Sequence, residues 1–80
     1  MDNTIPDTTI ELLKQDWVLI LRHATRYNGE QYFTVELSRW GMSKNGKLRS
    51  RKFFYGFGET INQASYDATK QVLTWLEANP

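Results

Sequence analysis

Residues 31–39, QYFTVELSR, give the clearest strand signal in the chain. Apolar side chains occupy every second position from Phe33 to Leu37, and polar side chains stand between them. Because successive side chains of a strand point to opposite faces, this period of two predicts a strand with one face in the core and the other in solvent. Further strands and helices are expected on both sides of it.

A first hairpin is predicted immediately upstream. Residues 17–26 are rich in β-favouring side chains, and their apolar start favours either burial on both faces or a change from helix to strand. Asn28 and Gly29 separate this segment from residues 31–39. Asn-Gly readily adopts the positive φ angles of a type I′ turn, so a tight hairpin is expected here.

A short helix is expected before the first strand. Asp7 or Thr8 can cap its N-terminus, and apolar residues follow at helical spacing: Ile10, Leu13 and Trp17. Residues 1–6 have no periodicity and are expected to form a flexible tail. Residues 7–80 are then expected to form one α+β binding domain, since 80 residues are too few for two cores.

The chain downstream predicts a loop, a third strand and a long helix. Residues 41–50 contain Asn45-Gly46 and are expected to form a long hairpin loop, with a strand over residues 51–57. From Thr60, a suitable N-cap, apolar residues recur at three- and four-residue intervals: Ile61, Ala64, Ala68, Val72, Trp75 and Leu76. The predicted fold is α-β-β-β-α, with a three-stranded antiparallel sheet packed on one face by helices.

Residues 56–60, Gly-Phe-Gly-Glu-Thr, precede small and leucine residues on this helix: Ala64, Ala68, Leu73 and Leu76. This pattern resembles the double-stranded-RNA-binding domain (dsRBD) family, which has a glycine pair, a Ser/Thr cap, two small helix residues and a leucine pair. The resemblance implies a dsRBD-like fold. The family's RNA-contacting lysine pair is replaced by Ile61 and Asn62, and the first hairpin lacks the family's groove-reaching loop. The usual duplex-RNA contacts are therefore not implied.

A weaker similarity runs to the AP2 and integrase arm-type DNA-binding domains. Gly46-Lys47 before the third strand, and Glu59-Thr60 followed by Ala64, are similar to their pattern. These domains read DNA through a three-stranded sheet. This similarity implies DNA as a possible ligand.

Basic residues are concentrated between the second and third strands. The net charge is only +1, but residues 39–52 contain six bases and no acid. The predicted nucleic-acid-binding residues are Arg39, Trp40, Lys44, Lys47, Arg49, Arg51 and Lys52. Lysine and arginine neutralise phosphates, and Trp40 with Tyr55 could stack on bases. The sequence predicts binding of an RNA or DNA backbone, although an acidic protein surface would be attracted by the same charges and a basic loop can simply be solvated.

Two other interaction surfaces remain open from the sequence. The outward sheet face is expected to gather Tyr32, Thr34, Glu36 and Phe54, as a stacking platform, a protein-docking surface or ordinary cross-strand packing. Glu36 would repel phosphate there and favours a protein. The alternative function is therefore a protein-interaction module, such as an adaptor or a small phage-type inhibitor. Self-association through an edge strand is a third alternative, and the oligomeric state stays open.

Chemistry-bearing patterns are scarce in this sequence. It has no cysteine, and its single histidine, His23, has no spaced partner for a metal. Gly56-x-Gly58-x-x-Ile61 lacks the third glycine of a dinucleotide fingerprint. We predict no catalytic residue, metal or cofactor. No apolar run reaches the roughly 18 residues of a membrane span and no signal peptide is visible, so a cytoplasmic protein without membrane contact is expected.

Overall fold

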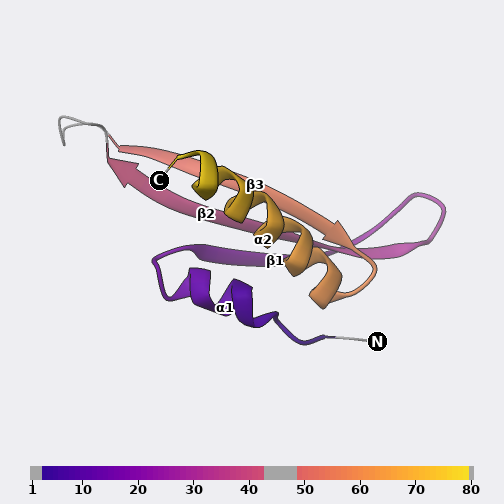
Figure 1. The fold of residues 1–80 in the computed structure, drawn as a ribbon. Coiled ribbons are helices and arrows are strands. Elements are labelled where there is room, and N and C mark those ends of the chain that lie inside the picture. Colours follow the sequence, from indigo (N-terminus) through magenta and orange to yellow (C-terminus); the bar gives the residue numbers. More distant parts are fainter. Residues whose placement is uncertain (1–2, 43–48, 80) are drawn as a thin grey trace.

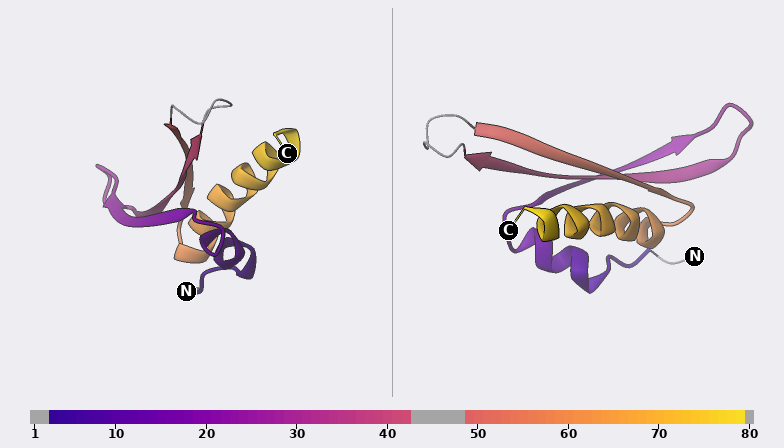
Figure 2. Two further views of the ribbon diagram at one scale, coloured as in Figure 1. Left: turned by 90° about the vertical axis from the view of Figure 1, so that its left-hand side faces the viewer. Right: turned by 45° about the horizontal axis from the view of Figure 1, so that its top comes forward.

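The computed structural model describes residues 3–42 and 49–79. Its elements are α1 (Asp7–Leu13), β1 (Val18–Thr25), β2 (Gln31–Met42), β3 (Arg49–Gly58) and α2 (Ile61–Ala78), as Figure 1 shows. The strands form one antiparallel sheet in the order β1-β2-β3, and both helices lie on one face of it (Figure 2). The predicted α+β class and element order are confirmed. Neither described helix has the length and apolar character needed to cross a membrane.

The core lies between α2 and the helix-facing side of the sheet. Val35 and Leu37 of β2 are completely buried, which confirms the alternation predicted for this strand. They meet the buried residues of α2, which include Ala64, Ala68 and Val72. Thr60 caps this helix, because its side chain accepts a hydrogen bond from the Gln63 N–H at 3.1 Å. The predicted N-cap and apolar stripe are therefore confirmed.

Two glycines of β3 allow α2 to cross the sheet closely. A Cβ atom added to Gly56 would lie 2.2 Å from the Ala64 carbonyl oxygen and 2.4 Å from the Ala68 nitrogen. One added to Gly58 would lie 2.6 Å from the Ala64 nitrogen. Such distances are far inside van der Waals contact, so only glycine fits under this helix. The glycine pair serves packing.

The first helix differs from its prediction in two ways. It begins at Asp7 behind Pro6, and no side chain caps it, so the predicted caps Asp7 and Thr8 are wrong. Its buried residues are Thr9 and Leu12, whereas Ile10 and Leu13 are exposed. The buried side is set by a hydrogen bond between the Thr9 and Thr69 hydroxyls, 2.5 Å apart, which joins α1 to α2.

This hydroxyl pair gives a testable contribution to stability. Replacing Thr69 with valine should cost about 1 to 3 kcal/mol, because the Thr9 hydroxyl would be left buried without its partner. The double variant Thr9→Val/Thr69→Val should lose less than Thr69→Val alone, since no polar group is then stranded. Urea denaturation of the three proteins measures this. An unchanged midpoint for Thr69→Val would contradict the assigned role.

The β1–β2 turn is not the predicted type I′ turn. The Arg26 N–H donates to the Glu30 carbonyl at 2.7 Å, and the Gly29 N–H donates to the Arg26 carbonyl at 2.8 Å. Gly29 has φ of 91°, and Asn28 is not among the residues with positive φ, as a type I′ turn would require. The hairpin therefore has a three-residue loop that ends in a left-handed glycine. The Asn28 side chain accepts from the Glu30 N–H at 3.0 Å and holds this shape.

The other strands also differ in extent and burial. Val18 and Leu21 of β1 are exposed, so the alternative of burial on both faces is wrong. The predicted loop over residues 41–50 is shorter than expected, because Gly41 pairs with Ser50 and Met42 with Arg49. Strand pairing therefore continues further into the hairpin than its small and charged residues suggested.

Side chains of α2 cover part of the free edge of β3. The Phe57 N–H donates to Asp67 Oδ2 at 3.0 Å. The Gln71 Nε2 donates to the Tyr55 carbonyl at 2.6 Å. Both backbone groups belong to the strand at the edge of the sheet, so the helix supplies hydrogen bonds that a fourth strand would otherwise offer.

Candidate functional site

The β2–β3 hairpin divides its basic residues between the two faces of the sheet. Arg39 pairs with Lys52 on the helix-facing side, and Trp40 pairs with Arg51 on the opposite side. We call this opposite side the open face, because neither helix covers it (Figure 2). Of the remaining predicted site residues, Lys44 and Lys47 lie outside the described residues, as does the side chain of Arg49. Among the described side chains, Arg39 and Lys52 therefore lie on one face and Arg51 lies on the other.

On the helix-facing side, aromatic rings support two of the cations. Trp17, Phe54 and Trp75 pack together, with ring centroids 6.0 to 6.5 Å apart. The Arg39 guanidinium carbon lies 4.9 Å from the Trp17 ring centroid, and Lys52 Nζ lies 5.9 Å from that of Trp75. Both distances are within the range of a cation–π contact. The rings hold the side chains without neutralising their charge.

On the open face, Arg51 is held by both aromatic and polar contacts. Its guanidinium carbon lies 4.9 Å from the Phe53 ring centroid and 5.7 Å from that of Trp40. Its Nη2 donates to Ser38 Oγ at 2.9 Å, while Nε is buried and has no hydrogen-bond partner among the described atoms. Arg51 is therefore oriented between two rings.

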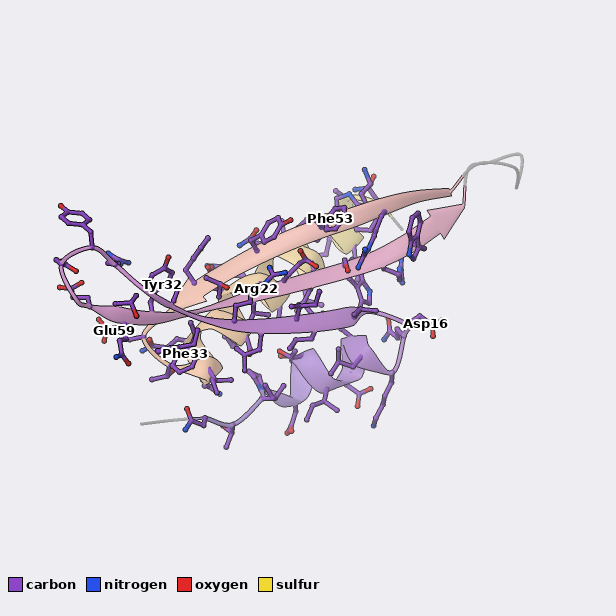
Figure 3. The ribbon with its side chains drawn as sticks, turned by 180° about the vertical axis from the view of Figure 1, so that it is seen from behind. Asp16, Arg22, Tyr32, Phe33, Phe53 and Glu59 are labelled. Atoms are coloured by element: carbon purple, nitrogen blue, oxygen red, sulfur yellow. The ribbon has the colours of Figure 1, made fainter. Side chains whose placement is uncertain are left out.

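The open face also carries a row of aromatic side chains. Along β3 it contains Phe53, Tyr55 and Phe57, and β2 adds Tyr32 and Trp40. We call these five residues the aromatic row. Tyr32 and Phe53 are labelled in Figure 3. The prediction that Phe54 belongs to this face is wrong, because Phe54 packs with Trp17 and Trp75 on the other side.

One feature of the sequence predicts which side chains of β3 face the helices. Consecutive aromatic residues from Phe53 to Tyr55 conceal the alternation, so either phase looks acceptable. Gly56, however, must face the alanines of the final helix if that helix approaches closely. Phe54 is two residues from Gly56 and shares its face, which sends Phe53 and Tyr55 outward.

Glu36 lies on the open face as predicted, but it is poorly accessible. Only 9% of the residue is exposed, and its strand neighbours are Ile20 on one side and Tyr55 on the other. The expected repulsion of phosphate by an exposed central carboxylate is therefore reduced. Two arginines of the same face, Arg22 and Arg51, are more accessible than Glu36.

The described cations of the hairpin are not held in ion pairs. Among the described side chains, the ion pair within 4 Å is Lys14 with Glu11, on α1 and its C-cap. Within that same set, Arg39, Arg51 and Lys52 contact rings or a hydroxyl and no carboxylate. Their charge can therefore act on an external anion.

His23 has local partners on the sheet. Its Nε2 lies 3.1 Å from Gln31 Oε1, and its ring packs against Phe33 with centroids 5.0 Å apart. Within residues 3–42 and 49–79, no three histidine, cysteine or acidic residues gather as metal ligands would. These contacts account for His23 as part of the sheet.

Comparisons of the chain with protein-family models, curated proteins and solved structures give no match. The function proposed below therefore rests on the geometry of this chain.

Proposed function

We propose that this domain binds nucleic acid through the end of the sheet formed by the β2–β3 hairpin. One observation carries the proposal: Arg39, Arg51 and Lys52 are held over aromatic rings and are not paired with carboxylates among the described side chains. Unpaired cations on a protruding hairpin attract phosphates and release condensed counterions. The fold carries the binding surface, and no chemical step is assigned to it.

The sequence adds charge beyond these three side chains. Lys44, Lys47 and Arg49 lie between Arg39 and Arg51 in the chain, with no acid among them. Over residues 39–52, a ligand that reaches the hairpin would therefore meet basic side chains and no acidic side chain. A basic segment without acidic residues suits the regular phosphates of a nucleic-acid backbone.

A protein partner with an acidic surface is the second candidate. The observation that favours it is the exposure of Phe53, Tyr55 and Phe57, because aromatic side chains are enriched at protein interfaces. Affinity purification after nuclease treatment distinguishes the two candidates. Recovery of one stoichiometric protein would support this second function, whereas loss of every partner would support nucleic acid.

The proposed function predicts a particular salt dependence. Binding of labelled RNA and DNA should be followed by fluorescence anisotropy between about 50 and 200 mM salt. The variant Arg39→Gln/Lys52→Gln should bind more weakly, and the slope of log Kd against log salt should fall by roughly 0.7 to 0.9 for each lost phosphate contact. The loss should be similar for many sequences, because phosphate contacts carry no base information.

The matched control removes the same charge elsewhere. Lys14→Gln/Lys70→Gln also lowers the net charge by two, but Lys14 follows α1 and Lys70 lies on α2. This control should leave the salt slope close to that of the parent chain. Equal effects of the two variants, or no binding of any nucleic acid at low salt, would contradict the proposal. Far-UV circular dichroism verifies that each variant is folded.

A further inference from the structure

We propose that the aromatic row of the open face is a stacking platform for the bases of single-stranded nucleic acid. This inference rests on the proposed function and names its ligand class. Nucleic acid would be held by phosphate contacts at the hairpin and by base contacts along β3. The two contributions come from different side chains and can be removed separately.

The rings of the aromatic row are accessible to solvent. The exposed fractions are 59% for Trp40, 44% for Phe53, 47% for Tyr55 and 58% for Phe57. These residues lie on one face of neighbouring strands, along most of the length of β3. Large rings left open together on one face mark a binding surface more often than single exposed apolar residues do.

The rings are also arranged in a regular series along the sheet. Phe53 and Tyr55 are nearly parallel, with an interplanar angle of 3° and centroids 6.4 Å apart. Tyr32 and Phe57 continue the row, with centroids 6.5 Å apart. Successive π surfaces along one strand suit successive bases, and stacking accepts any base because every base has a π face.

Arginine side chains accompany the aromatic row and complement the charge of an anionic chain. Arg51 lies over Phe53 and Trp40 at one end of the row, and Arg26 lies 5.1 Å from the Tyr32 ring centroid at the other. Arg22 stands between these ends, on β1 beside Thr34, and is labelled in Figure 3. Glu30 and Glu59 line the same hollow as Arg26, Tyr32 and Phe57, so the positive charge along the row is concentrated at Arg22 and Arg51. The occupant should therefore combine flat apolar groups with negative charge directed to that part of the row, which single-stranded nucleic acid does.

The side chains of the aromatic row also favour single-stranded nucleic acid over a duplex. Bases in a duplex present their edges in the grooves, where recognition needs hydrogen-bonding side chains. Phe53 and Phe57 have no such groups, and a duplex keeps its base faces inside the stack. The rings therefore favour bases that are already unstacked, as in single-stranded RNA or DNA.

The test compares ligands and ring variants in the full chain. Anisotropy titrations should use fluorescein-labelled homopolymeric single strands of RNA and DNA of about ten nucleotides, within the range of small single-strand binding sites, and a duplex of equal length. The single strands should bind more tightly than the duplex. Tyr55→Leu and Phe57→Leu should each weaken single-strand binding by roughly 5- to 150-fold, the loss of one base–aromatic stack, and leave the salt slope unchanged.

The control is Tyr66→Leu. Tyr66 is as exposed as Trp40, at 59%, but lies on α2 rather than on the sheet. Its replacement should not alter binding of any ligand. Circular dichroism melting of each variant separates a binding defect from unfolding.

The outcomes distinguish this inference from the proposed function. Equal binding of duplex and single strands, with ring variants of parental affinity but a flatter salt slope for Arg39→Gln/Lys52→Gln, would overturn the platform and keep the function. No binding of any nucleic acid would overturn both. Light scattering gives a further test. A mass of twice 9.4 kDa for the parent chain, together with a mass of 9.4 kDa for Phe57→Leu, would show that a second copy of the chain occupies the rings. That result would also overturn the platform.

Discussion

Replacing Gly56 with alanine should strongly destabilise the domain. The added Cβ would lie 2.2 Å from the Ala64 carbonyl oxygen and 2.4 Å from the Ala68 nitrogen, and neither backbone atom can rotate away. Helix α2 would have to move off the sheet and open the core around Val35. We expect a loss of about 3 kcal/mol or more, at the upper end of overpacking effects. A domain of this length has a total stability of only about 4 to 12 kcal/mol.

The control for Gly56→Ala is the same substitution at Gly29. A Cβ there would meet nothing within 4 Å, but the residue has φ of 91°. Gly29→Ala should therefore cost only about 1 to 2 kcal/mol, the price of a left-handed residue with a side chain. Guanidinium denaturation followed by circular dichroism compares the two. Equal midpoints would show that the close crossing of α2 is not what requires glycine.

Replacing Trp17 with alanine should have the second large effect on stability. Trp17 is 3% exposed and packs against Phe54 and Trp75, so its removal leaves a large cavity where the chain enters β1. Losses of about 3 to 5 kcal/mol are typical of such truncations. Arg39 would also lose the ring that supports it. Urea denaturation, with the folded fraction recorded at each urea concentration, measures the change in free energy of unfolding.

Trp17→Phe serves as the control for this variant. The Trp17 Nε1 is buried and has no hydrogen-bond partner among the described atoms. Phenylalanine removes that unsatisfied donor, which offsets part of the cost of the smaller ring. We expect Trp17→Phe to lie within about 1 kcal/mol of the parent. A loss as large as that of Trp17→Ala would show that the core requires the full volume of the indole and that a smaller aromatic ring cannot replace it.

The sequence predicts those elements whose periodicity is unambiguous. Val35 and Leu37 alternate with polar residues, so β2 and its buried face follow from the pattern. The final helix follows equally well, because Ala64, Ala68 and Val72 recur at helical spacing and Thr60 caps it. In both cases local preference and burial agree.

Other features depend on contacts between distant residues and could not be predicted. The buried side of α1 is set by Thr9 and Thr69, which are 60 residues apart. The basic stretch was predicted as one surface, but pairing of Arg39 with Lys52 and of Trp40 with Arg51 places its members on opposite faces. A one-residue change of phase moves a side chain across the sheet.

The cover that α2 gives to β3 also bears on fibre formation. From Phe53 to Phe57, four of five residues are aromatic, a composition that favours cross-β stacking when an edge is free. Asp67 and Gln71 already hydrogen-bond the Phe57 N–H and the Tyr55 carbonyl, so these two backbone groups are not free to pair with an incoming strand. At this edge, the domain can thus expose its rings to a ligand while part of the β3 backbone is closed to strand addition.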